Sequence, residues 1–325
     1  MSATSISVQS EYVPTPESER AAFDALERRE ADRTMGPRTH LRAERERLAG
    51  LRWQHFDVTP VGSTLGAEIS GIDLREELPG PVFAELERAL VDYKVVFLRD
   101  QHVDAARQVA FARRFGELEL HPFIPPNGEF PELCRFEKSE KMGGYENLWH
   151  HDVTWRERPS KYGILHAVKV PATGGDTLFS DMHAAYDGLD DAWRARVDGM
   201  WMVHDYMRAF GRLVPPDRRD EMRAKFPAPT HPAAGRHEVT GRRYLFVNRA
   251  FTERVDGMTR EESLPTIEHL ARQAELPEYQ CRFHWSDDAI AIWDNRAVQH
   301  YAASDYWPDV RIMERASVVG ERPTV

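Results

Sequence analysis

Four short apolar runs set the strongest limit on how this chain can fold. They read YGILHAVKV, RRYLFVN, YQCRFHW and AIAIWDN, at residues 162–170, 242–248, 279–285 and 289–295. Short runs rich in β-branched and aromatic residues are typical of strands. No regular strand–helix alternation, glycine-rich phosphate loop or internal repeat accompanies them. We therefore expect a mainly β fold with flanking helices, built as a sandwich or barrel.

A few helical segments are expected around these strands. The pattern at residues 79–93 repeats its apolar residues along one helical face. Asp104 is a suitable cap for a second helix, which Gly116 would end. Thr259 and Glu262 have the spacing of a capping box, which predicts the start of a third helix.

The first 52 residues differ from the remainder in composition. They are rich in Arg, Glu and Ala and contain few large apolar side chains. We expect a charged helical N-terminal extension over residues 1–52 and one large domain over residues 53–325. Such an extension could be partly mobile, or it could be an arm that packs on the body or on another subunit, which is consistent with a homo-oligomer.

Charge and composition exclude several classes of partner. The net charge of -10 argues against nucleic acid or an anionic membrane as the main partner. No apolar run approaches the length of a membrane span, and no signal-peptide pattern is present, so we expect a cytoplasmic protein. The 2 cysteines are too few for a disulfide framework or a four-thiolate cluster. Any metal must therefore be bound by nitrogen and oxygen atoms, which the 14 histidines can help to supply.

The stretch NLWHHDVTW, at residues 147–155, carries the first candidate site. If it forms a strand, His150 and Asp152 point to one face and His151 to the other. An aspartate between buried tryptophans is costly unless it binds a metal or a partner. Two histidines and one carboxylate form the facial triad of non-haem Fe(II) oxygenases, so a second histidine would have to come from elsewhere. The alternative is that these are ordinary polar residues with structural hydrogen bonds.

A second stretch with candidate functional residues lies near the C-terminus. It contains His300, followed by a predicted strand that carries Arg311 and Arg315. Residues four apart in a strand share a face, so the two guanidinium groups should converge and bind anions, most simply carboxylates. The alternative is that each arginine pairs with a nearby acidic residue such as Glu314 or Asp309.

Three segments together resemble a known family. WHHDVTW, TGGDTLFSDMHAAYDGL and IAIWDNRAVQHYAASDYWPDVRIMERA follow one another as in the taurine dioxygenase family of Fe(II)/2-oxoglutarate-dependent oxygenases. This group includes taurine, alkylsulfate and phenoxyalkanoate dioxygenases. The resemblance extends from about residue 55 to 322. It implies a distorted double-stranded β-helix (jelly-roll) core flanked by helices, with residues 53–325 as the oxygenase domain.

The resemblance also implies roles for particular residues. His150, Asp152 and His300 would bind Fe(II), which makes His151 the spacer. Arg311 would bind the distal carboxylate of 2-oxoglutarate, helped by the hydroxyl of Thr177. Dioxygen is the remaining co-substrate, and no catalytic side chain is expected beyond the metal centre.

The implied reaction is oxidation of a substrate with release of succinate and CO2. Halogenating relatives lack the carboxylate ligand, so Asp152 favours hydroxylation, with or without carbon–heteroatom cleavage. Desaturation and multi-step oxidation of a biosynthetic intermediate are alternatives within the family. A zinc hydrolase or a catalytically silent binding protein are alternatives outside it, but a hydrolase does not explain Thr177 and Arg311.

Four further residues match substrate-binding positions of the family. Arg315 corresponds to the arginine that binds the anionic group of taurine, and His121 to a histidine that contacts the same group. Phe210 and Phe251 correspond to aromatic pocket walls. Core packing of the phenylalanines and a structural hydrogen bond of His121 are the simpler alternatives.

Two positions depart from the taurine-cleaving pattern. Ile124 stands in place of a sulfonate-binding tyrosine, which removes a hydrogen bond worth on the order of 1 kcal/mol. Glu146 stands in place of an asparagine, and a carboxylate there repels anions and favours an ammonium group. We therefore expect a small anionic or zwitterionic substrate, such as a sulfonate, an alkyl sulfate or an N-substituted amino acid.

Overall fold

The computed structural model describes residues 36–144 and 146–325. The chain divides into two compact units, Met1–Pro37 and Arg38–Val325, and the description below concerns the second. Up to residue 35, the predicted N-terminal extension lies outside the described residues. Its last part forms a short 3-10 helix, η1 (Thr39–Leu41), and the helix α2 (Arg42–Ala49).

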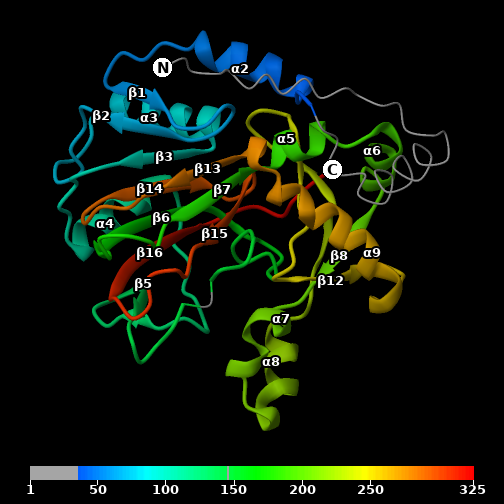
Figure 1. The fold of residues 1–325 in the computed structure, drawn as a ribbon. Helices are drawn as coiled ribbons and strands as arrows, with labels where there is room; N and C mark the ends of the chain where they lie inside the picture. The colour runs from blue at the N-terminus through cyan, green and yellow to red at the C-terminus, as the bar shows by residue number, and fades with distance from the viewer. Residues whose placement is uncertain (1–35, 145) are drawn as a thin grey trace, which may run out of the picture. The chain divides into compact units, whose positions relative to one another are not determined.

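Two facing sheets form the centre of this second unit (Figure 1). The larger has eight strands, in the order β1 (Asp57–Pro60), β2 (Ala67–Ser70), β3 (Val95–Leu98), β14 (Ile290–Asp294), β6 (Ser160–Lys169), β16 (Arg311–Val319), β5 (Phe130–Lys138) and β4 (Pro126–Asn127). The smaller has three strands, in the order β13 (Gln280–Phe283), β7 (Thr177–Asp181) and β15 (Val298–Ala302). Strand pairs in both sheets are antiparallel, except for the pair β2–β3.

The alternating pattern of the central strands produces two separate cores. In β14, Ile290 and Ile292 pack with α3 (Gly80–Tyr93) and α4 (Ala105–Ala112), which cover the outer face of the large sheet. Ala291 and Trp293 point the other way, into the layer between the two sheets. Because successive side chains of a strand point to opposite faces, alternate positions of the neighbouring strands also face this inner layer.

The helix boundaries agree with the capping signals in the sequence. The Asp104 carboxylate accepts a hydrogen bond from the Arg107 amide at the start of α4, and the 3-10 turn η2 (Arg113–Phe115) ends at Gly116. Thr259 and Glu262 form the predicted capping box at the start of α9 (Arg260–Ala271). The remaining helical elements are α5 (Met182–Asp187), α6 (Asp191–Val197), α7 (Met207–Phe210), η3 (Gly211–Leu213), η4 (Pro216–Arg218), α8 (Arg219–Lys225), η5 (Arg272–Glu275) and η6 (Pro277–Tyr279).

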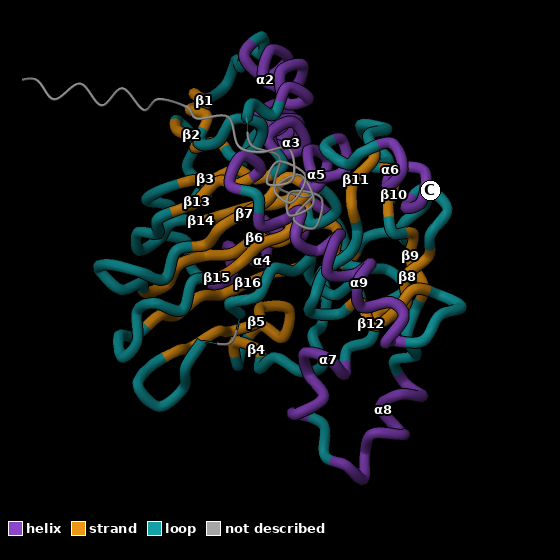
Figure 2. The backbone as a smooth tube through the Cα atoms, turned by 45° about the vertical axis from the view of Figure 1, so that its right-hand side comes forward, coloured by secondary structure: helices purple, strands orange, loops and turns teal. Residues whose placement is uncertain are grey.

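Smaller sheets and helices surround one end of the two central sheets. β12 (Thr252–Val255), β8 (Trp201–His204) and β9 (Thr230–Pro232) form one small sheet, and β10 (Ala234–Arg236) pairs with β11 (Arg243–Leu245). The run predicted as a strand at 242–248 is thus extended only over the short β11. Figure 2 shows α7 and α8 projecting beyond the sheets.

The predicted mainly β fold with flanking helices is confirmed. None of the helices in the described part of the chain is long and apolar enough to cross a membrane. Both cysteines, Cys134 and Cys281, are buried free thiols.

Candidate metal centre

The segment 147–155 does not form the continuous strand that was predicted. His150 exchanges two backbone hydrogen bonds with His300 of β15, at 3.1 and 2.9 Å, and the chain then turns, with Val153 at φ 59°. Two residues further on, at Asp152, the side chain of Asn295 takes the place of a neighbouring strand. Its Oδ1 accepts from the Asp152 amide at 2.7 Å, and its Nδ2 donates to the Asp152 carbonyl at 2.9 Å. The ladder therefore stops after one residue pair, because a side chain satisfies the backbone of Asp152.

The turn still brings the three predicted ligands together. One ligand atom from each of His150, Asp152 and His300 lies within 4.8 Å of the others. The His150 Nε2 and Asp152 Oδ1 atoms are 3.8 Å apart, as are the His300 Nε2 and Asp152 Oδ2 atoms. His151 points away and packs on the ring of Phe246, with ring centroids 4.8 Å apart. Within the described residues this is the one cluster of His, Cys, Asp or Glu suited to a metal ion.

Hydrogen bonds orient two of these ligands. The Nδ1–H of His150 donates to the Leu148 carbonyl at 2.6 Å, which leaves the Nε2 lone pair for a metal. The Asp152 Oδ1 atom accepts from an Arg315 NH group at 2.7 Å, whereas its buried Oδ2 atom has no hydrogen-bond partner. A buried carboxylate oxygen without a partner is costly, and a cation at this point would satisfy it. The residues present therefore fit an Fe(II) ion.

The protonation states also suit a metal. Burial alone would raise the pKa of Asp152, but the neighbouring Arg315, His300 and His150 bring it down to about 2. Burial lowers the pKa of His300 well below its usual value. At neutral pH the aspartate is thus ionised and His300 is neutral, which are the forms that bind metals.

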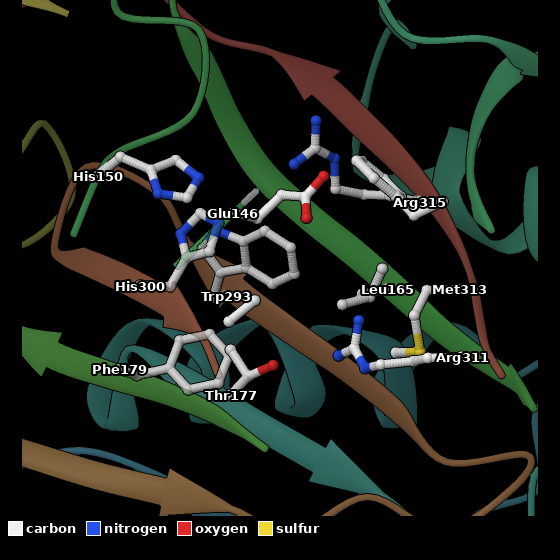
Figure 3. A pocket seen from close by; sticks show the side chains of 12 residues that line it. Glu146, His150, Leu165, Thr177, Phe179, Trp293, His300, Arg311, Met313 and Arg315 are labelled. Atoms are coloured by element: carbon white, nitrogen blue, oxygen red, sulfur yellow. The ribbon is translucent and has the colours of Figure 1, made fainter. Parts of the chain in front are cut away.

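A cavity between the two sheets extends from these histidines (Figure 3). It spans about 510 Å³ including its open mouth, and Arg311, Met313 and Arg315 of β16 reach it from one strand face. Thr177 of β7 lines the same cavity, and Phe136 and Leu165 supply apolar walls. The predicted convergence of the two arginines is therefore correct.

Arg311 has the surroundings of an anion-binding residue. Its Nε donates to the Gly175 carbonyl at 3.1 Å, while a buried terminal nitrogen has no hydrogen-bond partner. Burial lowers the pKa of Arg311, and the opposing charges of Tyr306, Glu146 and Asp176 are too weak to compensate for it. The alternative pairing with Glu314 does not occur, because Glu314 bonds to Arg135 at 2.7 Å. A guanidinium group with free donors beside a hydroxyl is suited to bind a carboxylate.

The predicted substrate residues form a neighbouring group. The His121 and Phe210 ring centroids are 5.4 Å apart, and those of Phe210 and Phe251 are 6.0 Å apart. They belong to an aromatic cluster beside the cavity rather than to its lining. Burial, and then the charge of Arg315, lowers the pKa of His121 to about 3, so its ring is neutral. Its Nδ1 accepts from the Ile124 amide at 3.0 Å, which leaves the Nε2–H as a donor.

Glu146 has a partner that the sequence did not reveal. Its carboxylate lines the cavity and forms an ion pair with Lys138 of β5 at 2.9 Å. This cation offsets the negative charge, which weakens the argument that Glu146 selects an ammonium group. Lys138 lies opposite Arg311 in the register of β5 and β16, and nothing in its local sequence indicated that position.

Two facing sheets that enclose a two-histidine, one-carboxylate cluster define a class, the non-haem metal-dependent oxygenases. A family model described as "Taurine catabolism dioxygenase TauD, TfdA family" matches residues 57–317. The chain belongs to this family, as the sequence resemblance predicted.

Individual relatives agree with this assignment. The chain is 34% identical to the alpha-ketoglutarate-dependent sulfate ester dioxygenase of Pseudomonas putida, over 82% of this chain and 91% of that protein. It is 30% identical to an alkylsulfatase of Acinetobacter baylyi, over 83% and 87% of the two chains. The crystal structure of a taurine dioxygenase from Burkholderia xenovorans superposes with a TM-score of 0.72 at 34% identity, covering 83% and 91%. The protein is therefore an Fe(II)- and 2-oxoglutarate-dependent dioxygenase, 2-oxoglutarate being another name for alpha-ketoglutarate.

Proposed function

We propose that this enzyme oxidises a small anionic substrate, with a sulfate ester or sulfonate as the leading class, at an Fe(II) ion held by His150, Asp152 and His300. Arg311 and Thr177 would bind the distal carboxylate of 2-oxoglutarate at the other end of the same cavity. The observation that carries the proposal is the pair of buried, unpartnered atoms at these two ends, Asp152 Oδ2 and a terminal nitrogen of Arg311. Fe(II) at one end and the distal carboxylate of 2-oxoglutarate at the other would satisfy these atoms.

The side chains have simple tasks in this reaction. When bound, Fe(II) supplies the redox chemistry that couples the decarboxylation of 2-oxoglutarate to succinate and CO2 with oxidation of the substrate by dioxygen. Asn295 holds the backbone of Asp152, and Arg315 holds its Oδ1 atom, so that the carboxylate stays beside the two imidazoles, with Oδ1 near His150 and Oδ2 near His300. The apolar walls of Phe136, Leu165 and Met313 limit water around the co-substrate.

Arg315 and His121 are the candidates to bind the anionic group of the substrate. Arg315 is buried and its Nε has no hydrogen-bond partner, so it can hold Asp152 and an anion together. The Nε2–H of His121 would add a neutral donor. Phe210 and Phe251 would contact the apolar part of the substrate, whereas Ile124 cannot supply the hydrogen bond of a tyrosine.

The similarity to a sulfate ester dioxygenase and an alkylsulfatase supports an anionic ester as substrate. Hydroxylation of the carbon that carries the sulfate oxygen would give a hemiacetal-like sulfate. Its collapse breaks the carbon–oxygen bond to sulfate and leaves an aldehyde. The Glu146–Lys138 pair, which has no net charge, is compatible with an anion in the cavity. Desaturation or multi-step oxidation remain within reach of the same site.

Three further assignments belong to this proposal. The two facing sheets would form a distorted double-stranded β-helix, or jelly roll. Residues 53–325 would be the oxygenase domain, although α2 also contributes Leu48 to the core of the second unit. The protein would act in the cytoplasm, as a homo-oligomer.

The proposal is tested by anaerobic spectroscopy of the protein with Fe(II) and 2-oxoglutarate. A weak visible charge-transfer band is expected from the chelated keto acid. It should disappear in His150→Ala and persist in His151→Ala, because His150 directs its Nε2 toward Asp152 whereas His151 packs on Phe246. Alkyl sulfates and sulfonates are then screened by succinate release. Absence of the band in the wild type would refute the proposed site.

A further inference from the structure

Trp285 contacts Thr177, at the proposed co-substrate end of the cavity, from the core between the two sheets. It follows β13, is 3% exposed, and packs edge-on against Phe283 in the core between the two sheets, with ring centroids 4.9 Å apart and an interplanar angle of 83°. Its indole Nε1 lies 3.0 Å from the Thr177 Oγ1 atom. Trp285 does not line the cavity, whereas Thr177 does.

The direction of this hydrogen bond is fixed by chemistry. An indole N–H is a donor only, so the Thr177 oxygen must be the acceptor. A hydroxyl has one hydrogen and two lone pairs, and Trp285 occupies a lone pair. Among the described residues, no acceptor takes the Thr177 hydrogen. That hydrogen is therefore available to an acceptor in the cavity.

We propose that Trp285 is a positioning residue for 2-oxoglutarate, because its N–H presets the Thr177 hydroxyl to donate to the distal carboxylate. Without that N–H, the hydroxyl oxygen could turn a lone pair toward the same carboxylate. A donor held in place before binding improves affinity, because less freedom is lost when the ligand arrives. The inference rests on the proposed function, since it needs 2-oxoglutarate to occupy the Arg311 end of the cavity.

Arg311 and Thr177 then act as a matched pair of donors. Gly175 holds Arg311 through the Nε atom, and Trp285 holds Thr177 through the hydroxyl oxygen. These supporting contacts use the Nε–H of Arg311 and a lone pair of Thr177. The terminal nitrogen of Arg311 and the hydroxyl hydrogen of Thr177 therefore stay available to the co-substrate. A chain of hydrogen bonds of this kind also strengthens each member, because each donor polarises the next.

A double-mutant cycle tests the inference. Binding of N-oxalylglycine, an unreactive analogue of 2-oxoglutarate, is measured by calorimetry on protein loaded with Mn(II). Thr177→Val, which removes the hydroxyl, should raise the Kd on the order of tenfold. Trp285→Phe should raise it several-fold in the wild-type background and have no further effect in Thr177→Val. Thr177→Ser keeps the hydroxyl and should restore the sensitivity to Trp285→Phe.

A neighbouring core residue provides the matched control. Phe283→Leu removes packing against the Trp285 ring in the same core but no donor to Thr177, so the Kd should stay close to that of the wild type. Equal effects of Trp285→Phe in both backgrounds, or an equal effect of Phe283→Leu, would show that only packing matters and would overturn the inference.

An independent measurement needs no variant of Trp285. In ¹⁵N-labelled protein, the Trp285 indole N–H resonance should move downfield when the analogue binds, because donation by Thr177 strengthens the bond that its oxygen accepts. An unchanged resonance on binding would overturn the inference while leaving the proposed function intact. A wild-type protein that binds no 2-oxoglutarate or analogue would refute both.

Discussion

At the scale of single residues, the position of Arg311 depends on a glycine. Gly175 has a φ of +71°, its amide donates to the Asp305 carboxylate at 2.8 Å, and its carbonyl accepts from Arg311. A Cβ atom at this position would lie 3.2 Å from the Arg311 Cδ and from the Tyr306 ring. The backbone conformation and the close approach of Arg311 both require the absence of a side chain.

The matched test compares Gly175→Ala with Gly241→Ala. Gly241 has a φ of +69°, but a Cβ there would meet no atom within 4 Å. Both variants should lose about 1–2 kcal/mol of unfolding free energy, the cost of an L-residue in the left-handed region. Only Gly175→Ala should also weaken 2-oxoglutarate binding, by on the order of tenfold, because Arg311 shifts. If Gly241→Ala weakened binding equally, general destabilisation would explain both.

At the scale of elements, one buried lysine joins three parts of the fold. Lys94 ends α3, and its ammonium group donates to Glu44 of α2 at 2.7 Å and to the Thr64 carbonyl at 2.6 Å. It also lies 3.3 Å from the carboxylate of Asp181, which ends β7 and caps α5. Burial would raise the pKa of Glu44, but hydrogen bonding to Arg47 and the charge of Lys94 lower it. This ion cluster anchors α2 to the sheets.

Removing this cation should destabilise the protein strongly. Lys94→Met leaves the buried carboxylate of Asp181 without its cation, which typically costs about 3–5 kcal/mol of unfolding free energy, whereas Glu44 keeps its ion pairs with Arg47 and Arg242. Arg42→Ala breaks the Arg42–Glu46 pair on the exposed side of α2 and should cost less than about 0.5 kcal/mol. Urea unfolding of both variants measures the difference. Similar midpoints for the two would contradict the anchoring role of Lys94.

At the scale of the whole molecule, many histidines are buried in neutral form. Burial lowers the pKa of His183 to about 3 and that of His231 to about 4, and both are remote in sequence from the three ligands. In the unfolded chain these groups titrate near 6.5. Between about pH 6.5 and 4 the unfolded state therefore binds more protons than the folded state. Stability is present above this window and is lost as the pH falls through it.

The metal-free protein should accordingly become less stable from pH 7.5 to pH 5. Each such histidine contributes a slope that approaches about 1.4 kcal/mol per pH unit well below 6.5. The measurement is the free energy of unfolding in urea at several pH values. His231→Gln keeps a donor for the Thr154 and Arg156 carbonyls. It should reduce the slope of the unfolding free energy against pH by the contribution of one titrating group, at most about 1.4 kcal/mol per pH unit. A flat profile between pH 6.5 and 5 would contradict this account.

The sequence alone determined the features that depend on near neighbours. The apolar run of β14, the Asp104 cap and the Thr259–Glu262 capping box each arise from residues within a few positions of one another. Periodicity and short-range hydrogen bonds are encoded locally, so they were predicted correctly. The three ligands were also predicted, because their spacing within ordered motifs matches a family. The strand at 147–155 was overestimated, because alternation cannot show that a partner strand is missing.

Tertiary structure decided which distant groups meet. Arg315 bonds to Asp152, Lys138 pairs with Glu146, and Trp285 donates to Thr177. The first and third contacts span 163 and 108 positions, and they depend on the registers of two facing sheets. A polar side chain in the sequence shows what it can donate or accept, but not what lies opposite. Because these groups are buried between the sheets, water cannot replace a lost partner, so losing one of these contacts costs free energy.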